Sequence, residues 1–368
     1  MQIPFLNPGA QTGALRPALL AAMAEVLDRG QFILGPQVAA LEAEVAAQLG
    51  AGFGVGVNSG SDALTLALRA LDLGPGDEVI TTPFTYIAPA ESVVQVGARL
   101  VFADIDPRTF TLDPEEVLRR LTPRTRAILP VHLFGQAASM DAWLPVAAER
   151  GIAVVEDCAQ AIGARWQGRC LGTLGRIGCL SFYPTKNLGA DGDGGMCVTS
   201  DEGLAKRLRM LRVHGMERRY HHDLHGYNSR LDELQAAILR VKLPHLEAWN
   251  GRRGEIALRY LSGLSGLPLE LPVTAPGNTH VWHVFALLTD RRDALQAHLA
   301  AQGVPTLIYY PLPLHLQKCY AGHGWAAGDY PVAEAVARRI LPLPLYPELT
   351  DAQVDHVIAA IRVFFAAR

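Results

Sequence analysis

Short apolar runs alternate with stretches of helical spacing through the first two thirds of the chain. Seven apolar runs predict strands, over residues 54–58, 78–82, 99–104, 127–133, 153–156, 178–182 and 195–199. Between two of these runs, Leu64, Leu68 and Leu71 recur at i, i+4 and i+7, which is the spacing of a buried helix face. This alternation predicts an α/β fold with a mostly parallel sheet that helices cover on both faces.

The last third of the chain has a different pattern. It predicts helices over residues 230–249, 253–264 and 292–302, a strand over residues 281–288, and two short helices up to the C-terminus. Pro244 is expected to bend or break the first of these helices. We therefore expect two domains, a large α/β domain over residues 1–250 and a smaller α+β domain over residues 251–368.

The composition narrows the classes of partner. Hydrophobic residues make up 49% of the 368 residues, charged residues 19%, and the formal net charge is -3. This balance gives neither a basic surface for nucleic acid nor a polybasic surface for membranes. We find no secretory signal and no apolar run near the ~20 residues of a membrane span, so we expect a cytoplasmic protein. The five cysteines lack C-x-x-C spacing and predict buried, reduced thiols, with no disulfide framework and no metal site.

Candidate chemistry begins with a lysine between two apolar strands. Lys186 stands in the string SFYPTKNLG, directly before the glycine-rich residues 189–195. A partly desolvated amine has a lowered pKa, which Schiff-base chemistry requires; the alternative is a solvated loop lysine. Of the three other lysines, Lys206 and Lys242 fall on predicted helices and are interpreted as surface residues, and Lys318 falls in a loop.

A carboxylate follows the fifth predicted strand. Asp157 stands at the carboxyl end of this strand, where open α/β sheets place their ligands. Its carboxylate is able to pair with a pyridinium nitrogen and keep a cofactor ring protonated, although a cap on the next turn is an equal alternative. Glu156 is expected to point to the opposite face because strand side chains alternate. Gln160 lies one turn further and is a candidate to approach a ring oxygen.

Three further positions are typical of a cofactor site. In VNSGSDALT a strand ends and a helix begins, so Gly60 and Ser61 predict an anion site at a helix N-terminus, with ordinary capping as the alternative. Tyr86, in TPFTY, is a candidate to stack on a flat ring, or else a core or interface tyrosine. Ser181 is a candidate phosphate ligand, or else a hydroxyl satisfied within the sheet.

Taken in chain order, these strings resemble one family. SGSDAL, TPFTY, VVEDCAQAIGA, SFYPTKNLG, GDGG and GYNSRLDELQAAIL are similar to the DegT/DnrJ/EryC1/StrS sugar aminotransferases, from about Phe32 to Tyr310 and beyond. The resemblance implies a fold-type I transferase that depends on pyridoxal 5′-phosphate. It implies that Lys186 carries the internal aldimine and that Asp157 pairs with the pyridine nitrogen.

The resemblance also implies the remaining cofactor contacts. They are phosphate ligands at Gly60, Ser61 and Ser181, a stacking ring at Tyr86, and Gln160 near the ring oxygen. Members of the family are dimers with shared active sites, and Asn228 matches the residue sent to the partner's phosphate. We therefore expect a homodimer.

Function follows from the same resemblance. It implies transfer of an amino group, with L-glutamate as donor and pyridoxamine phosphate as the intermediate form of the cofactor, to a nucleotide-linked keto-sugar. The strings NSRLDELQAAILRVKL and RYHH resemble members that aminate a 3-keto sugar, of the dTDP-linked 6-deoxyhexose or UDP-linked N-acetylhexosaminuronate type. The product would serve a surface polysaccharide or a glycosylated compound.

Substrate contacts and alternatives are less closely specified. Candidate substrate residues are His222, Arg230, Tyr310 and His315, with surface positions, packing or an ion pair as the alternatives. The same family acting on a 4-keto sugar or an inosose is the nearest alternative function. A catalytically silent regulatory protein that binds the cofactor is another, although an intact pair of Lys186 and Asp157 argues against it.

Overall fold

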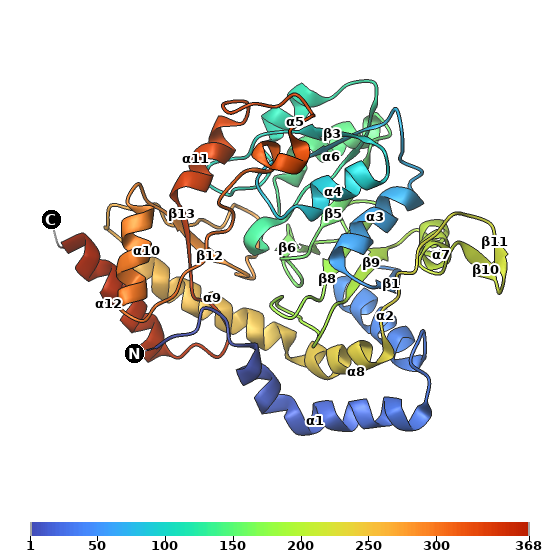
Figure 1. The fold of residues 1–368 in the computed structure, drawn as a ribbon, viewed down its shortest axis with the longest axis horizontal. Coiled ribbons are helices and arrows are strands. Elements are labelled where there is room, and N and C mark those ends of the chain that lie inside the picture. Colours follow the sequence, from blue (N-terminus) through green and yellow to red (C-terminus); the bar gives the residue numbers. More distant parts are fainter. Residues whose placement is uncertain (1, 367–368) are drawn as a thin grey trace.

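The computed structural model describes residues 2–366 (Figure 1). The helices are α1 (Pro8–Arg29), α2 (Pro36–Leu49), α3 (Gly60–Ala70), α4 (Ala88–Gln95), α5 (Pro114–Arg120), α6 (Met140–Glu149), α7 (Glu202–Leu211), α8 (Glu233–Lys242), α9 (Leu246–Gly263), α10 (Arg292–Ala301), α11 (Pro331–Arg339) and α12 (Asp351–Ala366). Short 3-10 turns are η1 (Leu133–Gly135), η2 (Leu243–His245), η3 (Leu314–Leu316) and η4 (Lys318–Tyr320).

The strands form one large sheet and three small ones. The strands are β1 (Phe53–Val57), β2 (Glu78–Thr81), β3 (Arg99–Phe102), β4 (Thr125–Ile128), β5 (Ala153–Asp157), β6 (Arg165–Trp166), β7 (Arg169–Cys170), β8 (Ile177–Ser181), β9 (Gly195–Thr199), β10 (Met216–Arg218), β11 (His221–His222), β12 (Phe285–Leu288) and β13 (Ile340–Leu343). The large sheet has seven strands in the order β1-β9-β8-β5-β4-β2-β3, and β9 runs opposite to the other six strands. All seven predicted strands are present, and the mostly parallel sheet is confirmed.

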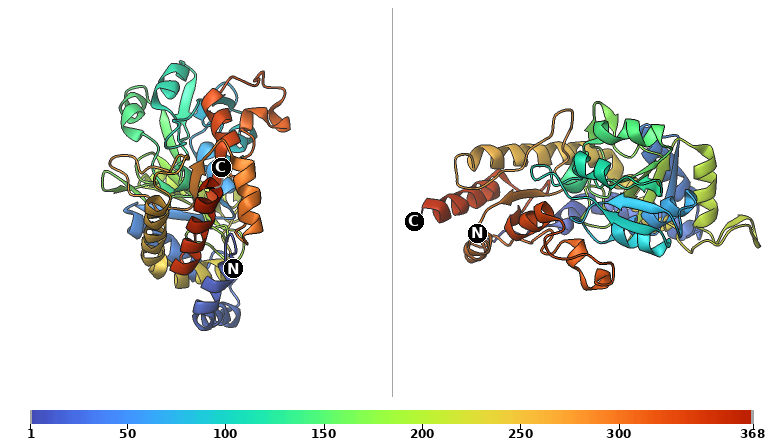
Figure 2. Two further views of the ribbon diagram at one scale, coloured as in Figure 1. Left: turned by 90° about the vertical axis from the view of Figure 1, so that its left-hand side faces the viewer. Right: turned by 90° about the horizontal axis from the view of Figure 1, so that it is seen from above.

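Alternation along each strand sorts the side chains between two helical layers. On β5, Val155 joins the core on the side of α3 and α4, whereas Val154 joins the core on the side of α5 and α6. On β9, Cys197 faces the first layer and Met196 packs toward α2 and α8. Helices therefore cover both faces of the sheet, as Figures 1 and 2 show, and both faces of each central strand are apolar, as a buried parallel sheet requires.

The long helical segment after the sheet is broken once. Pro244 lies in η2 between α8 and α9, so the predicted break is confirmed. The second helix begins at Leu246, before the predicted start at Arg253, because Pro244 lies in η2, ahead of α9, and interrupts no hydrogen bond within that helix. The predicted domain boundary between residues 250 and 251 falls inside α9 and stays a prediction.

The C-terminal part has its own core and also returns to the large sheet. Helices α9, α10 and α12 pack on the β12–β13 pair. Tyr320 and Tyr330 pack instead on Phe102 of β3. The predicted strand over residues 281–288 begins only at Phe285, because the N–H groups of Val281 and His283 donate to the η1 turn. In Figures 1 and 2 the β10–β11 hairpin projects at the end of the molecule opposite α12. Among residues 2–366, no helix combines the length and apolar character needed to cross a membrane.

Two predictions about single side chains are wrong. Lys242, interpreted as a surface lysine, is buried at the end of α8, because its amine binds partners in a loop that is distant in the sequence. Four cysteines are buried as predicted, but Cys319 is exposed because it lies on the short η4 turn at the molecular surface.

Candidate active site

A cavity of about 440 Å³ opens at the carboxyl edge of the large sheet. Asp157 ends β5 and Ser181 ends β8, and both line the cavity. The N-terminus of α3 and the loop after β2 contribute further walls, and His283 and Tyr310 close the cavity from the C-terminal part. This edge is where open α/β sheets bind their ligands, so the cavity lies where the strand-end residues predict a site.

The structure separates the candidate residues into two groups. Those that line the cavity are Gly60, Ser61, Tyr86, Asp157, Gln160, Ser181, Lys186 and Tyr310. Those that do not line it in the single chain are His222, Asn228, Arg230 and His315. The predicted cofactor residues thus converge, with the exception of Asn228, whereas most of the predicted substrate residues lie elsewhere.

Lys186 occupies a tight loop after β8. Its N–H donates to the Tyr183 carbonyl at 2.8 Å, and the Ala190 N–H donates to the Phe182 carbonyl at 2.7 Å, which closes the loop around the lysine. Burial lowers the pKa of the Lys186 amine from 10.5 to about 8, and the Asp157 carboxylate opposes this shift. A substantial fraction of the amine is therefore neutral near pH 8, the form that acts as a nucleophile or a base.

Asp157 presents a carboxylate with one oxygen engaged. Its Oδ1 accepts a hydrogen bond from the Ala159 N–H at 2.9 Å. Burial raises the pKa of this carboxyl group, and the Ala159 N–H and the Lys186 charge oppose that rise. The carboxylate is therefore costly to keep ionised without a further cationic partner, which a protonated pyridine nitrogen would supply.

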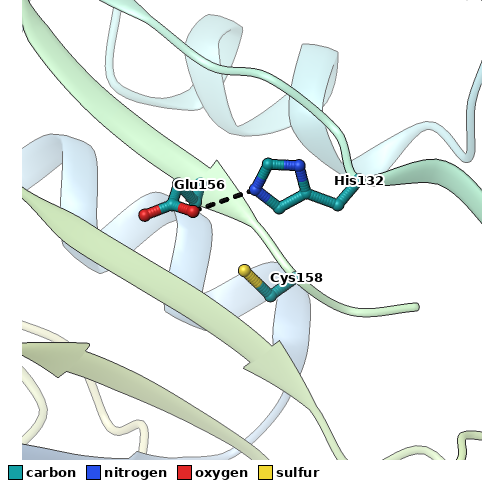
Figure 3. A group of neighbouring side chains, drawn as sticks. All are labelled: His132, Glu156 and Cys158. Carbon is teal, nitrogen blue, oxygen red and sulfur yellow. Dashed lines mark hydrogen bonds and ion pairs between the residues drawn. The ribbon is translucent and has the colours of Figure 1, made fainter. Parts of the chain in front are cut away.

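Glu156 points away from the cavity into a separate buried group with His132 and Cys158 (Figure 3). Its oxygens accept from the N–H groups of Gly172, Leu174 and Gly175 at 2.7–2.8 Å. The predicted opposite orientation of Glu156 and Asp157 is thus confirmed.

The hydrogen bonds of this group explain its chemistry. His132 Nδ1 accepts from the Ala138 N–H at 3.2 Å, so His132 Nε2 carries the proton and donates to Glu156 at 2.9 Å. Burial opposes ionisation of Glu156, but His132 and the backbone donors keep the pKa of its carboxyl below the usual value. Burial raises the pKa of the Cys158 thiol. Because the ring nitrogens and the carboxylate are already engaged, the geometry is that of a structural network rather than a cation site.

The N-terminus of α3 offers donors to an anion. Ser59 is the N-cap, and its Oγ accepts from the Asp62 N–H at 3.1 Å. The alternative of a capping role therefore applies to Ser59. Gly60 and Ser61 line the cavity, and amides in the first turn of a helix have no partner within the helix. A Cβ at Gly60 would lie 2.6 Å from the Cβ of Ser181, so glycine is what allows α3 to approach β8. Helix N-termini of this kind bind phosphate groups.

Aromatic and amide groups line the middle of the cavity. Tyr86 exposes 59% of its surface, more than a packed core tyrosine would. Gln160 is fixed at both ends of its amide, since Oε1 accepts from the Phe134 N–H at 2.8 Å and Nε2 donates to the Tyr310 hydroxyl at 3.1 Å. A flat ring thus has an exposed aromatic face and an oriented amide available to it.

The four candidates outside the cavity have other surroundings. His222 is exposed on the β10–β11 hairpin, where its Nδ1 contacts the His214 carbonyl at 2.9 Å, and Asn228 is also exposed. Arg230 is partly buried, and its Nε has no hydrogen-bond partner among the described residues. His315 is buried, and its Nε2 lies 3.1 Å from Glu334.

One group beside Lys186 has no counterpart in the sequence predictions. Asn187 Nδ2 donates to Asn250 Oδ1 at 2.7 Å and to the Val281 carbonyl at 3.0 Å, so its Oδ1 accepts from His283 Nδ1 at 3.0 Å. Burial lowers the pKa of His283 far below its usual value, helped by the charge of Lys186. The ring is therefore neutral, with Nε2 as its acceptor. No local motif signals this group, because its members come from three distant segments.

Comparison with known proteins agrees with this geometry. The model of the DegT/DnrJ/EryC1/StrS aminotransferase family matches residues 14–362. A dTDP-3-amino-3,4,6-trideoxy-alpha-D-glucose transaminase of Streptomyces venezuelae is 51% identical over 98% of this chain and 96% of its own. A UDP-N-acetyl-3-dehydro-alpha-D-glucosamine 3-aminotransferase of Acidithiobacillus ferrooxidans is 49% identical over 98% and 97%. A pleiotropic regulatory protein of Geobacillus stearothermophilus is 47% identical over 99% of both chains.

A solved structure shares the whole fold. The S. venezuelae protein DesV, crystallised in complex with a ketimine intermediate, has a TM-score of 0.98 and 51% identity, and the match covers 100% of this chain and 99% of that one. Solved neighbours also include forms with bound pyridoxamine phosphate. The lysine, the strand-end carboxylate and the anion site of the cavity fit a pyridoxal-phosphate cofactor.

Proposed function

Because the chain belongs to the DegT/DnrJ/EryC1/StrS aminotransferase family, we propose that it transfers an amino group from L-glutamate to C3 of a nucleotide-linked 3-keto sugar. It is a pyridoxal-phosphate-dependent aminotransferase. The observation that carries the proposal is the amine of Lys186, with a pKa lowered to about 8 by burial, in one cavity with the Asp157 carboxylate. The choice of a 3-keto sugar draws on the relatives that form 3-amino sugars.

Each cofactor residue has a distinct role in this proposal. The bound cofactor supplies an electron sink for the charge left on carbon when a proton departs. Asp157 holds the proton on the ring nitrogen, Tyr86 orients the ring face, and Gly60, Ser61 and Ser181 hold the phosphate. These roles are supported by the position of all five side chains or amides on the cavity wall.

Lys186 moves the proton. Its neutral amine would accept the proton from the α-carbon of the amino donor, acting as a general base. The resulting ammonium would then act as a general acid and deliver that proton to C4′ of the cofactor, and the second half-reaction would run these transfers in the opposite order. Substrate-side contacts are proposed for Tyr310, which lines the same cavity. Two successive half-reactions on one lysine predict ping-pong kinetics.

A homodimer with shared sites completes the proposal. His222 and Asn228 are exposed and lie outside the cavity of their own chain. In a dimer these residues would be free to reach the cofactor phosphate and the substrate of the other subunit. Arg230 and His315 remain candidate substrate contacts, although His315 is buried against Tyr330 with a ring separation of 4.7 Å.

A spectral titration tests the proposed reaction. L-glutamate is expected to convert the visible absorbance of the bound cofactor to the pyridoxamine form, and a 3-keto nucleotide sugar to restore it. Restoration by a 4-keto sugar alone would overturn the substrate and leave the enzyme class intact. Lys186→Ala is expected to lose turnover by at least ~10²-fold, as loss of a general base predicts; undiminished turnover in this variant would contradict the proposal.

A second function is favoured by one relative, the pleiotropic regulatory protein. A catalytically silent protein would bind the cofactor but would show no restoration with any keto-sugar. The same titration therefore separates the two functions, and the presence of both Lys186 and Asp157 in the cavity supports the enzyme.

A further inference from the structure

A second lysine lies buried close to the catalytic loop. Lys242 is the last residue of α8, and only 2% of it is exposed. Its Nζ donates to the Gly189 carbonyl at 2.9 Å and to Asp191 Oδ1 at 2.6 Å. A buried ammonium is costly unless it is paired and hydrogen-bonded, so these two partners account for its presence in the interior.

Both partners belong to the loop that carries Lys186. Backbone hydrogen bonds at the start and end of this loop, residues 182–194, close it: the Phe182 N–H donates to the Gly194 carbonyl at 2.8 Å, and the Ala190 N–H returns to Phe182 at 2.7 Å. Lys242 therefore contacts the second half of a closed loop whose first half carries the catalytic amine.

A neighbouring side chain of α8 adds a second attachment. Gln235 Oε1 accepts from the Asp191 N–H at 2.9 Å. A Cβ at Gly192 would lie 3.0 Å from the Gln235 amide, so the loop backbone follows the helix closely at this point. The side chains of Lys242 and Gln235 thus hold the loop against a helix that α1 and α2 in turn support.

The loop then passes into the cavity wall. Asp193 and Gly194 line the cavity together with Thr185 and Lys186, whereas Lys242 does not reach it. The geometry points to Lys242 as a positioning residue: its ammonium locks the loop and so fixes the direction from which the Lys186 amine enters the cavity. This inference deepens the proposed function and rests on it for the identity of the reaction.

A simple role at the helix end does not account for these contacts. A lysine in the last turn commonly binds the free carbonyls of its own helix. The Lys242 amine instead binds a segment 51–53 residues earlier in the chain. Its effect is therefore expected in the loop and at Lys186 rather than in α8.

The test compares Lys242→Met with Lys206→Met, which removes an exposed lysine paired with Glu217. Hydrogen exchange of the amides of residues 189–194 in the full chain, with and without cofactor, is expected to rise about tenfold or more in Lys242→Met. We expect kcat to fall about tenfold to a hundredfold with a smaller change in KM, since a misplaced catalytic group costs rate more than binding. Lys206→Met is expected to match the wild type in both measurements.

Two further variants keep the inference open to contradiction. Asp191→Asn removes only the negative charge that pairs with Lys242, on a partly exposed residue. It is expected to raise exchange and lower kcat, as Lys242→Met does, but by smaller factors. Lys242→Arg keeps a positive charge and is expected to show smaller changes in exchange and kcat than Lys242→Met. Unchanged exchange and kcat in a folded Lys242→Met, with only a lower Tm, would overturn the positioning role. Since exchange needs no substrate, failure of the proposed reaction would leave this measurement interpretable.

Discussion

Lys186 and Asp157 each change the protonation of the other. Burial lowers the pKa of the lysine to about 8 and raises that of the carboxyl, and the mutual attraction opposes both shifts. Uptake of pyridoxal phosphate by the cofactor-free chain requires the neutral amine, so its rate is expected to rise with pH, with a midpoint near pH 8, and to level off at higher pH. Stopped-flow absorbance at a series of pH values measures this midpoint.

A variant of Asp157 tests whether its carboxylate raises the pKa of Lys186. Among residues 2–366, Asp157 is the one charge that raises the pKa of Lys186, so Asp157→Asn is expected to move the midpoint to lower pH. Asp193→Asn removes another carboxylate of the cavity wall and is expected to leave the midpoint in place. A midpoint that moves upward in Asp157→Asn would show that the two groups are not coupled as the geometry indicates.

At the same scale, sequence patterns succeed where the periodicity of one element decides the outcome. Glu156 and Asp157 take opposite faces because strand side chains alternate. Lys242 was misread because a helical position does not reveal which distant loop covers it. The group of Asn187 and His283 cannot be predicted from a local sequence pattern for a related reason, since its hydrogen bond joins residues 96 positions apart.

At the scale of elements, the close contact between α3 and β8 allows a prediction about stability. Gly60→Ala would place a Cβ 2.6 Å from that of Ser181, and the backbone at the anion site would have to move. We expect a loss of about 1–3 kcal/mol in the free energy of unfolding and weaker cofactor binding. Gly254→Ala, inside α9 with open space at its Cβ, is the control and is expected to stabilise by about 0.5–1 kcal/mol. Urea unfolding and cofactor titration of both variants test this, and equal effects would contradict it.

Element boundaries show what the sequence could and could not predict. The seven strands were predictable because each is a short apolar run, and β9 matches its predicted range of residues 195–199. β4 ends at Ile128 rather than at 133, because the apolar run continues into the η1 turn, where Phe134 adopts a φ of 60°. β13 was missed because it pairs with the distant strand β12. The two short hairpins were missed because their strands, of two or three residues each, are too short to show an alternating pattern.

At the scale of the whole molecule, one carboxylate joins the large sheet to the C-terminal part. Asp104, buried just after β3, accepts the N–H groups of Val332 and Ala333 at the start of α11, each at 2.9 Å. It caps a helix that begins more than 220 residues later in the chain. No sequence pattern predicts a cap of this kind, because helix-capping signals are local.

This remote cap leads to a prediction about the coupling of the two parts. Asp104→Ala is expected to cost about 1–2 kcal/mol, to speed hydrogen exchange throughout α11, and to lower activity, since Tyr310 enters the cavity from the C-terminal part. Asp113→Ala removes an equivalent carboxylate that caps α5 locally through Glu115 and Glu116. It is expected to cost a similar free energy while leaving exchange in α11 and turnover unchanged. If both variants slow turnover equally, the loss follows global stability; if only Asp104→Ala does so, packing of α11 on the sheet holds the cavity together.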